Sequence, residues 1–185
     1  LHDIGKPKTR RFESGGGVSF HHHEVVGAKI ARKRLTAMRY PGDVIDSVCK
    51  LTELHLRFHG YGQGQWTDSA VRRYVRDAGD ELVRLHKLTR ADCTTRNPRR
   101  AAILAATYDD LEDRIAMLAQ QEELNSIRPD LDGNDIMTIL NVPSGPMIGK
   151  AYNYLLNVRL DEGPLTREQA IERLNTWWNS QTKSD

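Results

Sequence analysis

Apolar residues at helical spacing recur along almost the whole chain of 185 residues, and this periodicity constrains the fold most strongly. Residues from about 23 to 40 place Val26, Ile30, Leu35 and Met38 near that spacing. We expect further helices over about 41–58, from Thr67 or Asp68 through Val75, and over 81–92 and 98–125. Beyond these we expect helices around 136–140 and through 155–160. A last helix should run to about 178 from a capping box formed by Thr166 and Gln169. Between residues 10 and 20, three consecutive glycines predict a loop or short hairpin.

The fold class is therefore predicted to be all-α. A boundary near Arg128-Pro129 divides the chain into a helical domain over residues 1–128 and a small helical tail over residues 129–185. The first 60 residues carry 11 Lys and Arg against 6 Asp and Glu, so positive charge is concentrated there, where it would attract a phosphate substrate. A solvated helix face explains the same excess equally well.

Two isolated cysteines, Cys49 and Cys93, form neither a disulfide framework nor a CxxC zinc pattern. This usage predicts a reducing, cytoplasmic location. No apolar run approaches the length that spans a bilayer, so we expect no membrane partner.

The chain begins with Leu1-His2-Asp3-Ile4-Gly5-Lys6-Pro7, in which an adjacent His-Asp pair can supply one nitrogen and one oxygen ligand to a metal. Further ligands must come from other helices, and the candidates are His21, His22, His23, His55, His59 and Asp92. Among the candidates, Gly27 and Ala28 follow His23 and would let its helix approach closely, which favours His23 over His21 and His22. We therefore predict a metal site made by His2, Asp3, His23 and Asp92, with His2, Asp3 and Lys6 as the catalytic residues.

Other readings of these residues stay open. His21 and His22 are expected in a solvated loop, and His55 and His59 would share one face if both lay on a helix. His59 alternatively caps that helix, and Lys6 either contacts a phosphate or is exposed. Arg72, Arg73 and Arg76 are expected on a solvated helix face, and His86 is interpreted as structural.

Four segments together resemble the HD region of bacterial tRNA nucleotidyltransferases (CCA-adding enzymes) and related poly(A) polymerases. They are residues 1–7, Phe20-His21-His22-His23-Glu24-Val25-Val26-Gly27-Ala28, His55-Leu56-Arg57-Phe58-His59 and Arg90-Ala91-Asp92-Cys93. Residues 131–137, 143–149 and 163–170 resemble the RNA-contacting C-terminal region of the same family. The resemblance covers nearly the whole chain.

The resemblance implies an HD-domain helical bundle followed by a helical RNA-binding tail, with tRNA or another RNA as the partner. It places nucleotidyl transfer in a head domain with a Gly-Ser segment and paired aspartates, which this sequence lacks, and another metal-binding histidine before Leu1. We therefore interpret the chain as a fragment whose N-terminal nucleotidyltransferase head is missing.

In some family members the HD site hydrolyses cyclic phosphates, 2′-nucleotides or similar phosphoesters with a divalent metal, for which Mg, Mn or Ni would serve. On this basis we assign substrate binding to His55, His59, Arg96, Arg99 and Arg100, and RNA binding to Lys29, Arg32 and Lys33. Three hypotheses remain open: the HD and RNA-binding part of a CCA-adding enzyme or poly(A) polymerase, an independent HD phosphohydrolase, and a non-catalytic helical scaffold.

Overall fold

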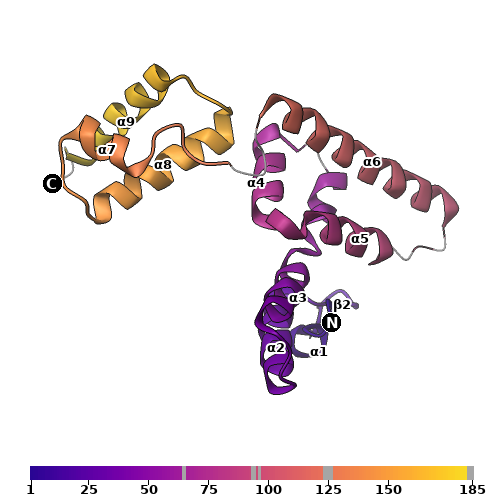
Figure 1. Cartoon of the computed structure of the whole chain (residues 1–185). Coiled ribbons are helices and arrows are strands. Elements are labelled where there is room, and N and C mark those ends of the chain that lie inside the picture. The colour runs from indigo at the N-terminus through magenta and orange to yellow at the C-terminus, as the bar shows by residue number, and fades with distance from the viewer. Residues whose placement is uncertain (64–65, 93–94, 96, 123–126, 183–185) are drawn as a thin grey trace. The chain divides into compact units, whose positions relative to one another are not determined.

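The computed structural model describes residues 1–63, 66–92, 95, 97–122 and 127–182, and its described segments are mostly helical (Figure 1). The predicted all-α class is confirmed, with one small hairpin added. The chain divides into two compact units, one of residues 1–65 and 77–113 and one of residues 66–76 and 114–185. These units interleave in sequence, and the domain boundary after residue 128 stays a prediction.

The first unit begins with the short helix α1 and a β-hairpin, which confirms the predicted hairpin. Figure 1 shows α2 and α3 side by side, with α1 and β2 near them. The elements are α1 (Lys6–Thr9), β1 (Arg11–Phe12), β2 (Val18–Ser19), α2 (His23–Ala37), α3 (Gly42–Leu54), the 3-10 helices η1 (Arg57–Gln63) and η2 (Gly79–Glu81), and α5 (Leu82–Asp92). Helices α4 (Asp68–Ala78) and α6 (Pro98–Gln121) contribute residues to both units.

Helix α2 buries mostly small residues. Of the four apolar residues at helical spacing, Leu35 is buried, Val26 and Ile30 are partly buried, and Met38 is 57% exposed. The buried residues are His23, Gly27, Ala28, Ala31 and Leu35, and the last three form a core with Ile45 and Cys49 of α3. Small side chains let the backbones approach closely, so α3 and the N-terminal turn can both pack on α2.

Gly5 shows how close that approach is. A Cβ atom at this position would lie 2.1 Å from the carbonyl oxygen of His23 and 2.8 Å from the backbone nitrogen of Gly27. Only glycine fits there, because both neighbours are backbone atoms that cannot rotate away. The N-terminal turn is thereby held against the first turn of α2.

The segment expected as one helix over residues 41–58 is divided into two elements. Helix α3 ends at Leu54, and η1 begins at Arg57. Within η1 the ring of Phe58 is buried and stacks on Tyr108, with ring centroids 3.6 Å apart. His55 caps the end of α3 and His59 lies in η1, so these two histidines do not share one helix face.

The second unit contains α7 (Gly133–Leu140), α8 (Pro146–Glu162) and α9 (Arg167–Thr182). Their shared core consists of Leu131, Ile136, Ile148, Ala151, Leu155, Ala170 and Leu174. The predicted capping box is confirmed: Thr166 accepts a hydrogen bond from the backbone of Gln169, whose side chain accepts one from Thr166. A second box, formed by Asp132 and Asp135, caps α7 and was not predicted.

Arg72 is not on a solvated face, which corrects the sequence-based expectation. Its side chain is 8% exposed and makes a bidentate pair with Glu122, with Nη2 2.7 Å from Oε1. Arg159 contacts the other oxygen of Glu122 at 3.1 Å. Arg76 is exposed, and Arg73 pairs with Asp161 at 2.7 Å. The partners of Arg72 lie 50 and more residues away in sequence, which is why local periodicity could not place this side chain.

Among the helices that the structure describes, none combines the length and apolar character needed to cross a membrane.

Candidate metal centre

The His-Asp pair lies in a turn before α1 rather than inside a helix. The amide of Lys6 donates to the carbonyl of Asp3 at 3.0 Å, which closes this turn. The Lys6 ammonium lies 2.7 Å from Asp3 Oδ2. Because Gly5 fixes the turn against α2, the other carboxylate oxygen of Asp3 faces the first residue of that helix.

Two buried histidines meet that oxygen. His23 begins α2 and His55 caps the end of α3, with side chains 8% and 1% exposed. Nε2 of His23 lies 3.3 Å from Asp3 Oδ1, and Nε2 of His55 lies 4.0 Å from the same atom.

Backbone carbonyls fix the tautomer of both rings. Nδ1 of His23 is 2.9 Å from the Phe20 carbonyl oxygen, and Nδ1 of His55 is 2.7 Å from that of Thr52. A carbonyl oxygen only accepts, so each Nδ1 must donate its proton. In the neutral rings the two Nε2 atoms then carry lone pairs, and both are buried without a hydrogen-bond partner.

A second histidine–carboxylate pair extends the cluster. His2 Nε2 lies 3.2 Å from Asp92 Oδ1, at the end of α5, and 3.5 Å from Asp3 Oδ2. The rings of His2 and His23 each lie 5.2 Å from the ring of His55. Three imidazoles and two carboxylates from four separate segments are thus linked by contacts of this kind.

The charge states suit a cation. Burial raises the pKa of Asp3, but the hydrogen bond and charge of Lys6, together with His2 and His23, outweigh it and hold this pKa below its usual range. Burial lowers the pKa of His55, although its hydrogen bond to the Thr52 carbonyl opposes the shift. Asp3 is therefore ionised and His55 neutral near pH 7, which are the states that bind metals.

Asp3, His23 and His55 each offer one ligand atom, and these atoms lie within 4.8 Å of one another. Lone pairs facing a carboxylate repel one another unless a cation lies between them. Imidazole nitrogen with carboxylate oxygen is a donor set for divalent transition metals. The residues present therefore fit a divalent ion, with His2 and Asp92 beside the three closest donors.

The structure brings together all four residues predicted as ligands, His2, Asp3, His23 and Asp92, and places Lys6 against Asp3. His55, which was assigned to substrate binding, lies among the ligand atoms. His55 was also among the candidate metal ligands, and its position supports that alternative. His59 is exposed, as are His21 and His22 in the loop before α2.

The other assigned residues lie on the surface or outside the described part of the chain. Arg99 and Arg100 are exposed in the first turn of α6, whereas Arg96 lies outside the described residues. Lys29, Arg32 and Lys33 are exposed on α2, where Arg32 pairs with Asp46 at 2.8 Å. Their assignments stay predictions.

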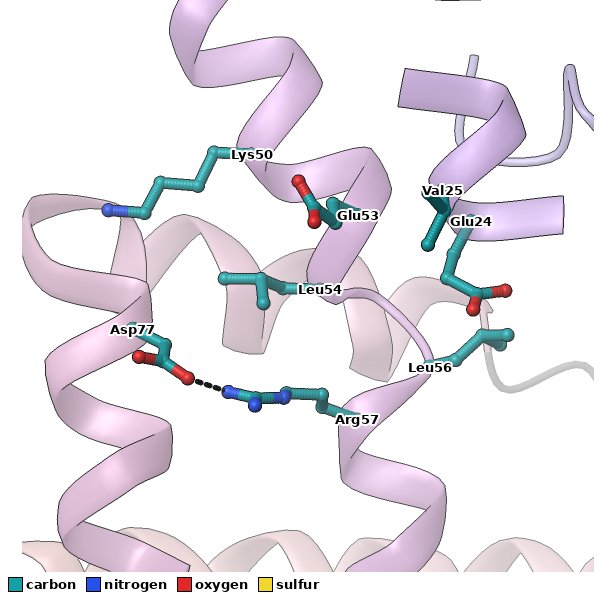
Figure 2. Close-up of a pocket in the computed structure, with 8 residues that line it drawn as sticks. All are labelled: Glu24, Val25, Lys50, Glu53, Leu54, Leu56, Arg57 and Asp77. Atoms are coloured by element: carbon teal, nitrogen blue, oxygen red, sulfur yellow. Dashed lines mark hydrogen bonds and ion pairs between the residues drawn. The ribbon is translucent and has the colours of Figure 1, made fainter. Parts of the chain in front are cut away.

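A pocket of about 550 Å³ is lined in part by residues that follow two of the histidines in sequence (Figure 2). Glu24 follows His23 in sequence, Leu56 follows His55, and both line this pocket. Figure 2 shows Arg57 paired with Asp77 at its edge. Oε2 of Glu24 is buried without a hydrogen-bond partner. Sequence reasoning did not single out this pocket.

The arrangement of a His-Asp turn against two helix-terminal histidines defines the class of this protein. Residues 1–119 match the HD domain family, and the chain belongs to that family.

Two curated relatives extend the similarity to almost the whole chain. Over 181 residues it is 32% identical to the CC-adding tRNA nucleotidyltransferase of Thermus thermophilus, covering 96% of this chain and 38% of that protein. Over 179 residues it is 30% identical to the A-adding tRNA nucleotidyltransferase of Deinococcus radiodurans, covering 96% and 40%. The chain thus spans about two fifths of the length of these relatives. No solved structure matches it significantly.

Proposed function

We propose that this chain is the HD and RNA-binding part of a tRNA nucleotidyltransferase, of the CCA-adding, partial-CCA-adding or poly(A) polymerase type. Its HD centre binds a divalent metal and hydrolyses phosphoesters. Nucleotidyl transfer itself belongs to a separate head domain, and the protein acts in the cytoplasm. The similarity to two tRNA nucleotidyltransferases supports the RNA-processing role.

One observation carries the metal part of this proposal. His23 and His55 bury Nε2 atoms that have no partner, and both atoms face the ionised carboxylate of Asp3. Leaving a buried polar atom without a hydrogen bond costs about 1–3 kcal/mol. Two such atoms around one carboxylate therefore favour a metal-binding site over the non-catalytic scaffold. Mg, Mn or Ni would serve, and of these three the two imidazoles favour Ni.

In hydrolysis, the oxygen of a water molecule bonds to phosphorus, the P–O ester bond breaks, and the leaving oxygen takes up a proton. A metal bound here would lower the pKa of that water and polarise the phosphoryl oxygen. Lys6 holds Asp3 in place, and the Nδ1–H groups of His23 and His55 keep both rings oriented through backbone carbonyls. The His2–Asp92 pair would be the group that accepts or returns the proton, because it lies beside Asp3.

Metal removal tests this centre. Manganese at about 100 times its Kd should stabilise the folded chain by about 2.7 kcal/mol, and a chelator should reverse the rise in melting temperature. His55→Ala should remove most of this metal-dependent rise. His59→Ala is the matched control, because His59 is exposed, and should retain it. A melting temperature that metal and chelator leave unchanged in the unsubstituted chain would favour the non-catalytic scaffold.

The RNA-binding part predicts a strong dependence on salt. Lys29 and Lys33 are exposed on α2, and each phosphate contact they make should contribute about 0.7–0.9 to the slope of log K against log salt. The double variant Lys29→Gln/Lys33→Gln should bind tRNA more weakly and reduce the slope by about 1.4–1.8. Lys87→Gln, at another exposed position, is the control. Equal slopes for the double variant and the unsubstituted chain would show that this face of α2 does not contact the RNA.

A further inference from the structure

The β-hairpin presents an exposed apolar pair that the metal centre does not use. Phe12 of β1 lies opposite Val18 of β2, so their side chains share one face of the hairpin. Phe12 is 75% exposed and Val18 46%. A phenylalanine this exposed does not stabilise the fold by burial, so its ring is available to a ligand.

One cationic side chain lies against this ring, and two more are close to it in sequence. The guanidinium of Arg10 lies 5.0 Å from the centroid of Phe12, and Lys8 and Arg11 are exposed. Within the part of the chain that the structure describes, none of the three forms an ion pair. Unpaired cations around an exposed aromatic ring suit a ligand that offers both phosphate groups and flat bases.

Both ends of the hairpin are joined to the metal centre. At its start, α1 contains Lys6, whose ammonium contacts Asp3 and lies 5.9 Å from the ring centroid of Phe20. At its end, the carbonyl of Phe20 accepts the Nδ1 hydrogen bond of His23. A strand bound on the hairpin therefore lies next to the residues that would hold the metal.

We infer that the hairpin over residues 10–20 binds single-stranded RNA. One base stacks on Phe12, the phosphates contact Lys8, Arg10 and Arg11, and the strand presents a phosphoester to the metal centre. The inference rests on the proposed function and deepens it, because it names a polynucleotide strand rather than a free nucleotide as the substrate class. A duplex is disfavoured, since its bases are stacked on one another and cannot reach an exposed ring.

The test uses the whole chain and a fluorescent RNA of eight adenosines, with binding followed by anisotropy in the presence of a chelator. Phe12→Ala should weaken binding between about fivefold and 100-fold, and Phe12→Trp should retain it. Arg10→Gln/Arg11→Gln should weaken binding and flatten its salt dependence. Tyr40→Ala is the matched control, because Tyr40 is an aromatic residue of the same unit that is 45% exposed. A duplex of equal length should bind more weakly.

Two results would overturn the inference. One is equal affinity for the RNA in Phe12→Ala and the unsubstituted chain. The other is Phe12-dependent binding to vesicles of anionic lipid without binding to the RNA. Because the chelator keeps metal out of the binding assay, the RNA affinities can be interpreted even if the chain binds no metal. The rise in melting temperature of the unsubstituted chain with manganese reports on the metal centre separately.

Discussion

Replacing Asp3 by asparagine should reduce metal-dependent phosphodiesterase activity by more than about 100-fold. Loss of an outer-shell partner already costs 10- to 100-fold in metal affinity or activity, and Asp3 is a direct ligand in the proposed centre. Asparagine has nearly the same shape but no charge, so the negative oxygen that faces His23 and His55 disappears. Hydrolysis of an aryl phosphodiester in the presence of manganese measures the effect.

The Asp3→Asn variant should still fold. The side chain of Asp3 is 41% exposed and its partner Lys6 is 40% exposed, so their pair contributes at most about 1 kcal/mol to stability. The melting temperature without metal should therefore stay close to that of the unsubstituted chain. Asp113→Asn, at an exposed carboxylate of α6, controls for a general effect of lost charge. Retained activity in Asp3→Asn would exclude the proposed centre.

Replacing Glu122 by alanine should destabilise the second unit by about 3–5 kcal/mol. The Glu122 side chain is 4% exposed and accepts hydrogen bonds from Arg72 and Arg159, whose side chains are 8% and 10% exposed. Its loss leaves Arg72, which also donates to the Leu160 carbonyl, and Arg159 buried without their carboxylate. Arg159 lies 3.7 Å from Asp130, which compensates only in part.

Tryptophan fluorescence during unfolding in urea measures this effect selectively. All three tryptophans, Trp66, Trp177 and Trp178, belong to the second unit. Glu162→Ala is the matched control, because it removes a Glu–Arg pair of the same unit whose side chains are 41% and 50% exposed. That variant should lose no more than about 1 kcal/mol. Equal losses in the two variants would show that the buried network has no special role.

Local patterns predicted most helices because spacing and capping act within a few residues. Thr67 caps α4 as expected, and Val71 and Val75 on this helix are buried. The choice of His23 from three consecutive histidines rested on Gly27 and Ala28, and both are buried where α2 meets its neighbours. The helix and cap predictions succeeded because the relevant partners are close in sequence, whereas the role of His23 stays a prediction.

Contacts between segments that are distant in sequence could not be predicted from local patterns. The ring of Phe58 stacks on Tyr108, 50 residues further along the chain, and His55 rather than His59 lies among the candidate ligand atoms. The burial of Arg72 likewise depends on Glu122 and Arg159. The close approach of Gly5 requires small residues on one face of α2, which apolar spacing alone does not reveal.

The most direct measurement is an anomalous diffraction map from crystals of the chain soaked in manganese chloride. We expect one strong peak at coordination distance, roughly 2.0–2.3 Å, from a carboxylate oxygen of Asp3 and from Nε2 of both His23 and His55. No peak there at millimolar manganese, or rings turned so that Nδ1 faces Asp3, would contradict it.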